Sequence, residues 1–449
     1  MSFSILTNEL KKIFPSASFD SNEYFSISTD SRTVRHDQIF LPLVGEKFDG
    51  HDYINEVFSK GIQLSFCEVE KIDRVKENNR SKLILVDKTL DAYHKLANFY
   101  RNKINPKVIA ITGSSGKTTV KDLIACVLST KYKVHKTQFN FNNEIGVPKT
   151  ILEMPNDTEV LILELAMRGK GEIKYLSKTS EPDIAIITNI GSAHIGRLGD
   201  LDSILKAKCE ILEHLKQDGV AILHNTPNLI HQALSVWKGT TITFDLEQAK
   251  DIIFKDGKSF FLLNKTHEEF YINALGNIHV LNSLIAIDVA LDLNLSHEEI
   301  QNGLSKFSVP DGRGNIIKLK NDCYLINESY NANPESLRAA ILNLIQCWDK
   351  DYKKVLVLGE LAELGSEENK QLNELVDWIK EQSLNVVITV GEQGKKLKQI
   401  NIAVNVKDNV ECCGIVKELL KPKTVVLIKG SRVAKLDRVM NDLITTQDK

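Results

Sequence analysis

The residues with the clearest chemistry form a glycine-rich segment between an apolar run and a helical pattern: Gly113, Ser114, Ser115, Gly116, Lys117, Thr118 and Thr119. Backbone N–H groups of such a loop and the positive end of the following helix bind phosphate oxygens, and a lysine adds a point charge. The Thr118 hydroxyl is placed to reach Mg²⁺. Because Ile111 stands where the usual first glycine would fall, the segment has the shorter form T-G-x-x-G-K-T-T. We predict that it binds a nucleoside triphosphate.

Two further polar residues lie where later apolar runs end. Glu164 interrupts the apolar run 160–166, and a buried carboxylate is costly unless a metal ion or a lysine partners it. His194 follows the next apolar run. A loop histidine alone is usually structural, but beside Thr118 and Glu164 it is a candidate neighbour of a second metal ion or of phosphate.

Lys208 lies on the apolar stripe of a helix expected over residues 201–215, whereas Lys206 falls on the opposite side. An inward lysine can extend its ammonium group to solvent, and spacing alone favours this interpretation. Alternatively, burial lowers its pKa and it reacts with CO₂ to give a carbamate that binds Mg²⁺ as a carboxylate does.

An early polar cluster is the fourth candidate. Ser28, Asp30, Ser31 and Arg32 bring hydroxyls, a carboxylate and a guanidinium together within five positions. These groups could hold a polar ligand, and they are equally typical of an ordinary turn.

The elements that must position these residues alternate between strand and helix, which indicates an α/β fold with mainly parallel sheets. Polar residues should converge beyond the carboxyl ends of the strands. We expect a smaller α/β domain over 1–104, a central P-loop-type ATPase domain over 105–310 and a C-terminal Rossmann-like doubly wound domain over 311–449. A helix is expected over 91–100, a linker over 101–107 and a hinge at 312–314. The expected strands are 108–112, 160–166, 183–190, 220–224, 323–327, 354–358, 386–390 and 424–429.

Composition excludes several classes of protein. The formal net charge of -2 argues against non-specific nucleic-acid binding, and no run of about 18 apolar residues predicts a membrane span. The first ten residues do not resemble a signal peptide, and the seven cysteines show no metal-binding spacing. We expect a cytoplasmic monomer without nucleic-acid or membrane partners.

Several motifs together resemble the ATP-dependent Mur ligases of peptidoglycan synthesis, in order and spacing along the whole chain. They are Thr112 to Thr119, Asn142-Asn143-Glu144-Ile145-Gly146-Val147-Pro148, Glu164-Leu165-Ala166, Ala193-His194, and Lys206 to Ile211. Further motifs narrow the resemblance to the members that add D-alanyl-D-alanine to a UDP-linked muramoyl tripeptide: Phe48 to Asp52, Ser329 to Pro334, Leu358 to Gly365, and Lys429 to Arg432.

The resemblance implies a role for each matching residue. Lys117 would bind ATP phosphates, Thr118 the first of two Mg²⁺ ions, and Glu164 and His194 would hold metal. Lys208 would be carbamylated, which reverses the expectation from spacing. Arg313 would reach the ATP phosphates when the C-terminal domain closes, and Asn282 and Asn331 would lie near the nucleotide. Ser28, Asp30, Ser31, Arg32 and Asn143 would belong to the UDP-substrate site.

Two departures from the family pattern affect these roles. A frequent acidic pair before Ser-Tyr-Asn-Ala-Asn is Asn327-Glu328 here, so a carboxylate contact to the ATP ribose must come from Glu328. The usual Gly-x-His-Asn-x-x-Asn reads Gly276 to Asn282 with its histidine displaced by one position, to His279.

The activity implied is amide ligation through an acyl phosphate, with positioning and charge neutralisation as the main contributions to catalysis. The sequence shows no convincing nucleophilic triad, and this mechanism requires none. Two alternatives stay open at this stage. One is another ligase of the superfamily that joins a different amine, including a folylpolyglutamate synthetase, and the other is a binding protein switched by ATP without ligation.

Overall fold

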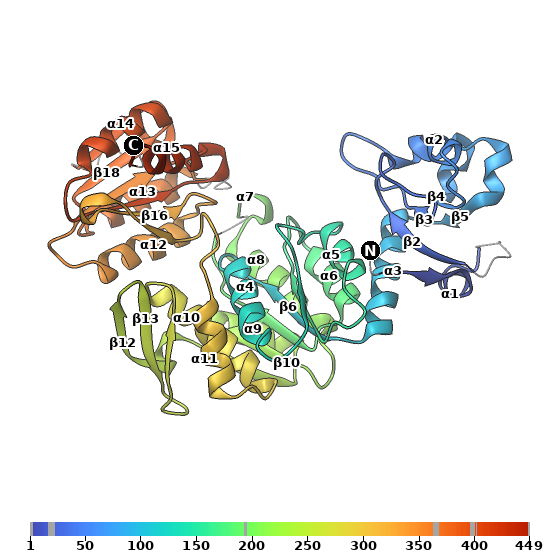
Figure 1. Cartoon of the computed structure of the whole chain (residues 1–449), viewed down its shortest axis with the longest axis horizontal. Coiled ribbons are helices and arrows are strands. Elements are labelled where there is room, and N and C mark those ends of the chain that lie inside the picture. The colour runs from blue at the N-terminus through green and yellow to red at the C-terminus, as the bar shows by residue number, and fades with distance from the viewer. Residues whose placement is uncertain are drawn as a thin grey trace.

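The computed structural model describes residues 3–16, 23–192, 195–361, 368–395, 400 and 402–447. Its elements form three bodies in a row, with the N-terminal body at one end, the central body in the middle and the C-terminal body at the other end (Figure 1). This three-domain α/β arrangement confirms the predicted fold class. The predicted boundaries after residues 104 and 310 stay a prediction.

The N-terminal domain is built on a five-stranded sheet of order β1-β2-β3-β4-β5, in which only the β1–β2 pair is antiparallel. Its strands are β1 (Ile5–Leu6), β2 (Tyr24–Ser28), β3 (Gln38–Phe40), β4 (Ser65–Glu68) and β5 (Leu83–Val86). Its helices are α1 (Thr7–Ile13), α2 (Ile54–Ser59) and α3 (Thr89–Ile104).

Helix α3 joins this domain to the central one. Its buried face shares one hydrophobic core with the N-terminal sheet and with central helices. The expected linker over 101–107 is wrong for its first part, because the helix continues to Ile104 and Asn105 ends it in a left-handed conformation. The helix continues because Tyr100 and Arg101 are both buried at its end, and burial of their side chains stabilises the last turn.

The central domain contains a six-stranded, wholly parallel sheet of order β11-β10-β9-β6-β8-β7. Its strands are β6 (Lys107–Thr112), β7 (Val134–Lys136), β8 (Val160–Glu164), β9 (Ile184–Ile187), β10 (Val220–His224) and β11 (Thr240–Phe244). Alternate residues of β6 pack into two different hydrophobic cores, which explains why the strand is apolar throughout rather than on one face.

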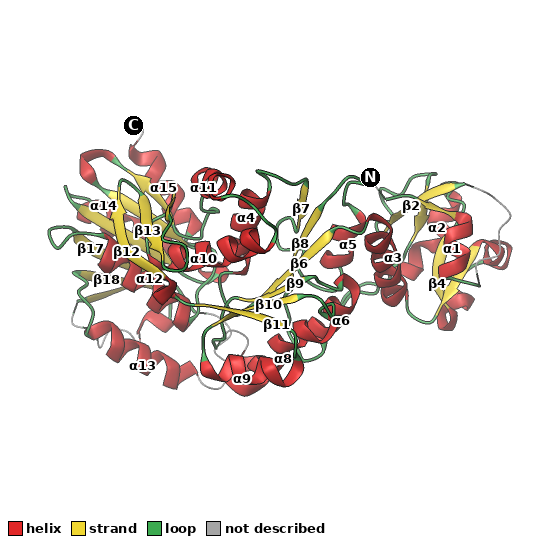
Figure 2. Ribbon diagram, turned by 90° about the horizontal axis from the view of Figure 1, so that it is seen from below, coloured by secondary structure: helices red, strands yellow, loops and turns green. Residues whose placement is uncertain are grey.

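Helices cover both faces of this sheet (Figure 2). One face packs against α5 (Gly146–Leu152), α6 (Glu172–Ser180), α8 (Leu201–Cys209) and α9 (Pro227–Val236). The other face packs against α4 (Lys117–Leu128), α10 (Asn277–Asp292) and α11 (His297–Lys306). The short helix α7 (Ile195–Leu198) precedes α8, and residues 210–214 continue α8 as a 3₁₀ turn.

A second central sheet has no counterpart in the sequence prediction. It is antiparallel, of order β12-β13-β14, and consists of β12 (Ala249–Lys255), β13 (Lys258–Leu263) and β14 (Glu269–Ile272). Buried residues of β13 and β14 share a core with α4, α10 and α11, so this sheet supports the helices behind the phosphate loop.

The C-terminal domain has a six-stranded sheet of order β15-β16-β20-β17-β18-β19, antiparallel only at β15–β16. The strands are β15 (Asn315–Lys318), β16 (Tyr324–Glu328), β17 (Lys353–Leu358), β18 (Val386–Val390), β19 (Ala403–Val406) and β20 (Thr424–Lys429). Helices α12 (Pro334–Cys347) and α13 (Glu368–Lys380) pack on one face, and α14 (Asn409–Leu419) and α15 (Asp437–Gln447) on the other.

Among the described helices, none combines the length and the apolar character that a membrane span requires.

The close packing of α11 on the phosphate-loop helix α4 generates a stability prediction. A Cβ at Gly303 on α11 would lie 2.4 Å from the Val127 Cα on α4, whereas a Cβ at Gly414 on α14 would have no atom of a described residue within 4 Å. Gly303→Ala should therefore destabilise the protein by about 1–3 kcal/mol through overpacking. The matched variant Gly414→Ala should be neutral or stabilise by up to about 1 kcal/mol, because alanine favours helix. Urea unfolding followed by circular dichroism measures both, and equal effects would contradict the packing described.

Candidate active site

The phosphate loop lies between β6 and α4 and is held by the loop that follows β9. Ser114 N donates to Asn189 O at 3.1 Å, and Ser115 N donates to Asn189 Oδ1 at 2.9 Å. Gly113 packs so closely against Thr188 that a Cβ would lie 1.9 Å from the Thr188 hydroxyl. Only glycine fits at position 113, and the loop conformation is fixed by a neighbouring strand end.

Lys117 and Thr118, in the first turn of α4, hydrogen-bond to the phosphate loop and to Glu164. Lys117 Nζ donates to Gly113 O at 2.7 Å, so the lysine side chain folds back over the phosphate loop. The Thr118 hydroxyl donates to Glu164 Oε2 at 2.8 Å. The first turn of α4 therefore presents its hydroxyl to the carboxylate at the end of β8.

Glu164 is the last residue of β8 and is 3% exposed. Its second carboxylate oxygen, Oε1, accepts from Asn142 Nδ2 at 2.8 Å, and its backbone N–H donates to the Thr137 hydroxyl at 3.0 Å. No lysine pairs with this carboxylate among the residues that the structure covers, so the lysine-paired interpretation is not what the fold adopts. A carboxylate and a hydroxyl are oxygen ligands of the kind that Mg²⁺ prefers.

Lys208 on α8 is 1% exposed, and burial together with the Lys117 charge holds its pKa well below the usual value. The interpretation from spacing alone is wrong, because the buried amino group does not extend to solvent. In the part of the chain described here, no carboxylate pairs with Lys208. A buried amine of low pKa is neutral and nucleophilic. His194, the other predicted metal neighbour, lies outside the described residues.

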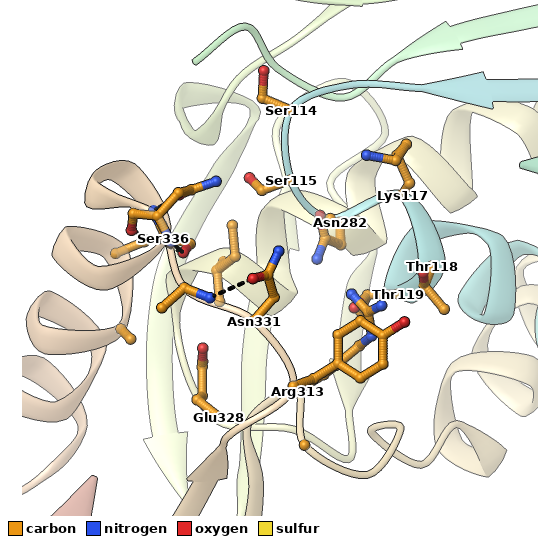
Figure 3. Close-up of a pocket in the computed structure, with 18 of the residues that line it drawn as sticks. Ser114, Ser115, Lys117, Thr118, Thr119, Asn282, Arg313, Glu328, Asn331 and Ser336 are labelled. Atoms are coloured by element: carbon orange, nitrogen blue, oxygen red, sulfur yellow. Dashed lines mark hydrogen bonds between the residues drawn. The ribbon is translucent and has the colours of Figure 1, made fainter. Parts of the chain in front are cut away.

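The C-terminal domain closes the other side of a cavity of about 330 Å³. All residues predicted to bind ATP except Gly113 line it, together with Glu164, and the phosphate loop faces the C-terminal residues across it (Figure 3). The Arg313 guanidinium lies 4.1 Å from the centre of the Tyr330 ring. Lys429 Nζ donates to Glu328 Oε2 at 2.6 Å and to Asn331 O at 3.2 Å.

The displaced histidine His279 also lines this cavity. It is 4% exposed, its Nδ1 has no hydrogen-bond partner among the described residues, and burial lowers its pKa to about 4. His279 Nε2 and Glu328 Oε1 both lie within 4 Å of the point where a Gly314 Cβ would be. One turn further along α10, Asn282 Oδ1 approaches Gly116 of the phosphate loop. Helix α10 therefore spans the cavity from the phosphate loop to Glu328.

The residues predicted for the UDP substrate do not line this cavity. Asp30 binds the Arg32 guanidinium through both carboxylate oxygens, at 2.9 and 2.7 Å, and this contact lowers the pKa of Asp30 to about 2. Ser28 Oγ accepts from Asp30 N, and Ser31 O accepts from Lys60 Nζ. Residues 28–32 form a turn at the end of β2, in the N-terminal domain. Asn143 Oδ1 accepts from Gly146 N at the start of α5.

Sequence reasoning did not assign a role to four residues that shape the site. Asn142, Tyr330 and Lys429 stood in recognised motifs, and Asn142 and Tyr330 adjoin Asn143 and Asn331, to which roles were assigned, so position in a motif could have identified them. Glu335 carries no such signal, because it lies outside those motifs and its partner Ser192 is distant in sequence.

Comparison with known proteins agrees with this architecture. Family models match residues 23–101 (Mur ligase family, catalytic domain), 111–290 (Mur ligase middle domain) and 312–432 (Mur ligase, glutamate ligase domain). The chain belongs to the Mur ligase family, and it is an ATP-dependent ligase.

Within the family, the chain is similar to the MurF members. It is 36% identical over 435 residues to the UDP-N-acetylmuramoyl-tripeptide--D-alanyl-D-alanine ligase of Bacillus subtilis, covering 95% of this chain and 94% of that protein. The crystal structure I of MurF from Acinetobacter baumannii matches with a TM-score of 0.88 at 29% identity over 99% of both chains. The MurF ligase of Thermotoga maritima in complex with ADP matches with a TM-score of 0.84 at 27% identity, covering 94% of this chain and 98% of that one.

The buried histidine predicts a pH dependence of stability. The pKa of His279 is about 4 in the folded protein and 6.5 as its ordinary value, so the unfolded chain binds more protons below pH 6.5. The free energy of unfolding therefore decreases as the pH falls towards 4. Protonation of His279 accounts for about 2 kcal/mol of this decrease between pH 7 and pH 5. His279→Asn should reduce the loss measured by urea unfolding at the two pH values. The exposed His231→Asn is the control, and an unchanged loss in His279→Asn would contradict the assignment.

Proposed function

We propose that this chain joins D-alanyl-D-alanine to UDP-N-acetylmuramoyl-tripeptide, converting ATP to ADP and phosphate, in the cytoplasmic synthesis of peptidoglycan precursors. The observation that carries the proposal is one cavity lined by the phosphate loop, by the buried Glu164 and by Arg313, Glu328 and Asn331 of the C-terminal domain. The similarity along the whole chain to ligases of that name supports the same choice of substrates.

The reaction proceeds in two steps. A terminal carboxylate oxygen of the tripeptide attacks the γ-phosphorus of ATP, the bond to the β-phosphate oxygen breaks, and an acyl phosphate and ADP result. The amine of D-alanyl-D-alanine then attacks the acyl carbon, the bond to the phosphate oxygen breaks, and the amine loses a proton. Lys117 and the backbone N–H groups of the loop offset the charge of a carboxylate against a triphosphate, and Arg313 adds to this from the C-terminal domain.

The Thr118 hydroxyl and Glu164 fit a Mg²⁺ site, because a buried carboxylate and a hydroxyl 2.8 Å apart offer hard oxygen ligands beside the phosphate loop. We assign these two residues to the Mg²⁺ ions, two in number, and His194 and Lys208 to the same set. Magnesium supplies charge neutralisation of the phosphates when bound. Asn142 orients the Glu164 carboxylate towards Thr118, and this orientation is the protein's own contribution.

Lys208 is proposed to act as a carbamate. Its neutral amine attacks the carbon of CO₂, a proton leaves the nitrogen, and a carboxylate forms at the end of the side chain. Burial and the neighbouring Lys117 charge, which lower the pKa of Lys208, both favour the amine that this step needs. The carbamate would give Lys208 a negative group with which to bind Mg²⁺.

The N-terminal domain is proposed to hold the UDP part of the substrate through Ser28, Asp30, Ser31 and Arg32, with Asn143 on the central side. The Arg32 side chain is 85% exposed, so it is accessible to a diphosphate. The three proposed domains, 1–104, 105–310 and 311–449, act within one monomer.

The direct test is phosphate release by the purified protein with ATP and Mg²⁺. We expect release only when both the UDP-tripeptide and D-alanyl-D-alanine are present, because each step consumes one of them. Release without either substrate would favour an ATP-switched protein. Release with another amine, and none with D-alanyl-D-alanine, would favour a different ligase of the superfamily.

The carbamate generates a prediction with a matched control. Lys208→Ala should lower kcat at least about 100-fold, because it removes a group that we assign to the Mg²⁺ ions. Removing CO₂ and bicarbonate from the wild-type assay should lower activity, and adding bicarbonate should restore it. Lys206→Ala, two positions away on the exposed side of α8 and paired with Asp202, should retain full activity. Ligation by Lys208→Ala at the wild-type rate, with no effect of bicarbonate, would contradict this role.

A further inference from the structure

Two hydrogen bonds join the first turn of α12 in the C-terminal domain to the loop after β9. Ser192 N donates to Glu335 Oε1 at 2.9 Å, and the Ser192 hydroxyl donates to Glu335 Oε2 at 2.8 Å. Ser192 is 9% exposed, so this serine is held against its partner rather than free in solvent. Both carboxylate oxygens are used, which fixes the orientation of the glutamate as well as its position.

The same loop is bonded to the phosphate loop. The Ser114 hydroxyl donates to Gly191 O at 3.0 Å and accepts from Gly191 N at 2.8 Å, one residue before Ser192. Glu335 is therefore connected to the phosphate loop through a single intervening loop segment. A displacement of Glu335 from Ser192 would act on the residues that hold Ser114.

The other end of α12 is anchored to the central domain as well. Asn343 Nδ2 donates to Leu275 O at 2.9 Å, and Asn277 Nδ2 donates to Gln346 Oε1 at 3.0 Å. The approach is so close that a Cβ at Gly276 would lie 1.4 Å from Asn343 Oδ1. Helix α12 is thus fixed at both ends, over a length of about 16 Å between Glu335 and Gln346.

Three residues of α12 between the anchors face the cavity. Ser336, Ala339 and Ala340 line it, and Figure 3 shows Ser336 on this helix across from the phosphate loop. Asn331 lies in the turn just before α12, and it accepts through its backbone carbonyl from Lys429. The seating of α12 therefore sets how far the C-terminal side of the cavity lies from the phosphate loop.

We propose that Glu335 is a positioning residue for the ligase reaction. Its bond to Ser192 seats the C-terminal domain on the phosphate-loop side, and thereby places Arg313 and Asn331 at the nucleotide. The predicted effect of Glu335 on turnover rests on the proposed function. Its predicted effect on nucleotide affinity rests only on nucleotide binding. Glutamate suits it because its two oxygens accept from an N–H and an O–H at once, and because charge-assisted hydrogen bonds are stronger than neutral ones.

The test measures KM for ATP, kcat, and the affinity for ADP by calorimetry in the full-length protein. Glu335→Ala should raise KM for ATP and Kd for ADP about tenfold, with kcat at saturating ATP reduced less than about threefold. Ser192→Ala should have a smaller effect, since its backbone N–H still donates. Glu335→Gln should recover part of the loss, because its amide oxygen still accepts from Ser192 N.

A double-mutant cycle separates this role from a general loss of structure. The combined Glu335→Ala and Ser192→Ala variant should bind ADP as tightly as Glu335→Ala alone, because both changes break the same contact. Glu374→Gln, an exposed carboxylate on α13, is the control and should match the wild type. Multiplying effects in the double variant, or wild-type ADP affinity in Glu335→Ala, would overturn the proposal. If Glu335→Ala does not fold, wild-type ADP affinity in both Glu335→Gln and Ser192→Ala overturns it instead.

The ADP measurement needs no ligation, so it distinguishes the two proposals. A wild-type protein that binds ADP but releases no phosphate with both substrates would refute the proposed function. The comparison of Glu335 variants for ADP affinity would still decide the role of Glu335.

Discussion

The active site depends on the hydrogen bonds that one buried carboxylate, Glu164, accepts. Glu164 ends a central strand of a parallel sheet, where an unpartnered carboxylate would be costly. The Thr118 hydroxyl and the Asn142 amide each take one of its oxygens. These bonds tie the phosphate-loop helix, the end of β8 and the segment before α5 to a single point. The proposed Mg²⁺ ligands Thr118 and Glu164 meet at that point, beside the phosphate loop.

Charge is distributed unevenly around this point. Lys117 and Lys208 lie close enough for the charge of Lys117 to help lower the pKa of Lys208, and no carboxylate pairs with Lys208 in the described chain. On the opposite side of the cavity, Lys429 is already paired with Glu328. A triphosphate bound at the phosphate loop would bring negative charge beside Lys117, whose positive charge already acts on Lys208. A neutral ligand would gain little from the same arrangement.

Local patterns predicted the parts of the fold that depend on periodicity, and tertiary contacts decided the rest. The parallel strands and the convergence of Thr118 with Glu164 follow from apolar runs and from where they end. Burial of Lys208 does not follow from its spacing, because the neighbouring elements decide whether a side chain reaches solvent. The contact of Glu335 with Ser192 crosses two domains, and no spacing in the sequence encodes it. The antiparallel sheet β12-β13-β14 was missed because its strands are partly exposed and their pattern is weak.

The claim that the site makes an acyl phosphate can be tested by following one oxygen atom. The terminal carboxylate of the UDP-tripeptide is labelled with ¹⁸O, the ligation is run with ATP and D-alanyl-D-alanine, and the released phosphate is examined by ³¹P NMR. Because a carboxylate oxygen attacks the γ-phosphorus and leaves with it, we predict one ¹⁸O atom in each phosphate released at complete labelling. Phosphate without ¹⁸O, or AMP and pyrophosphate in place of ADP and phosphate, would contradict the mechanism.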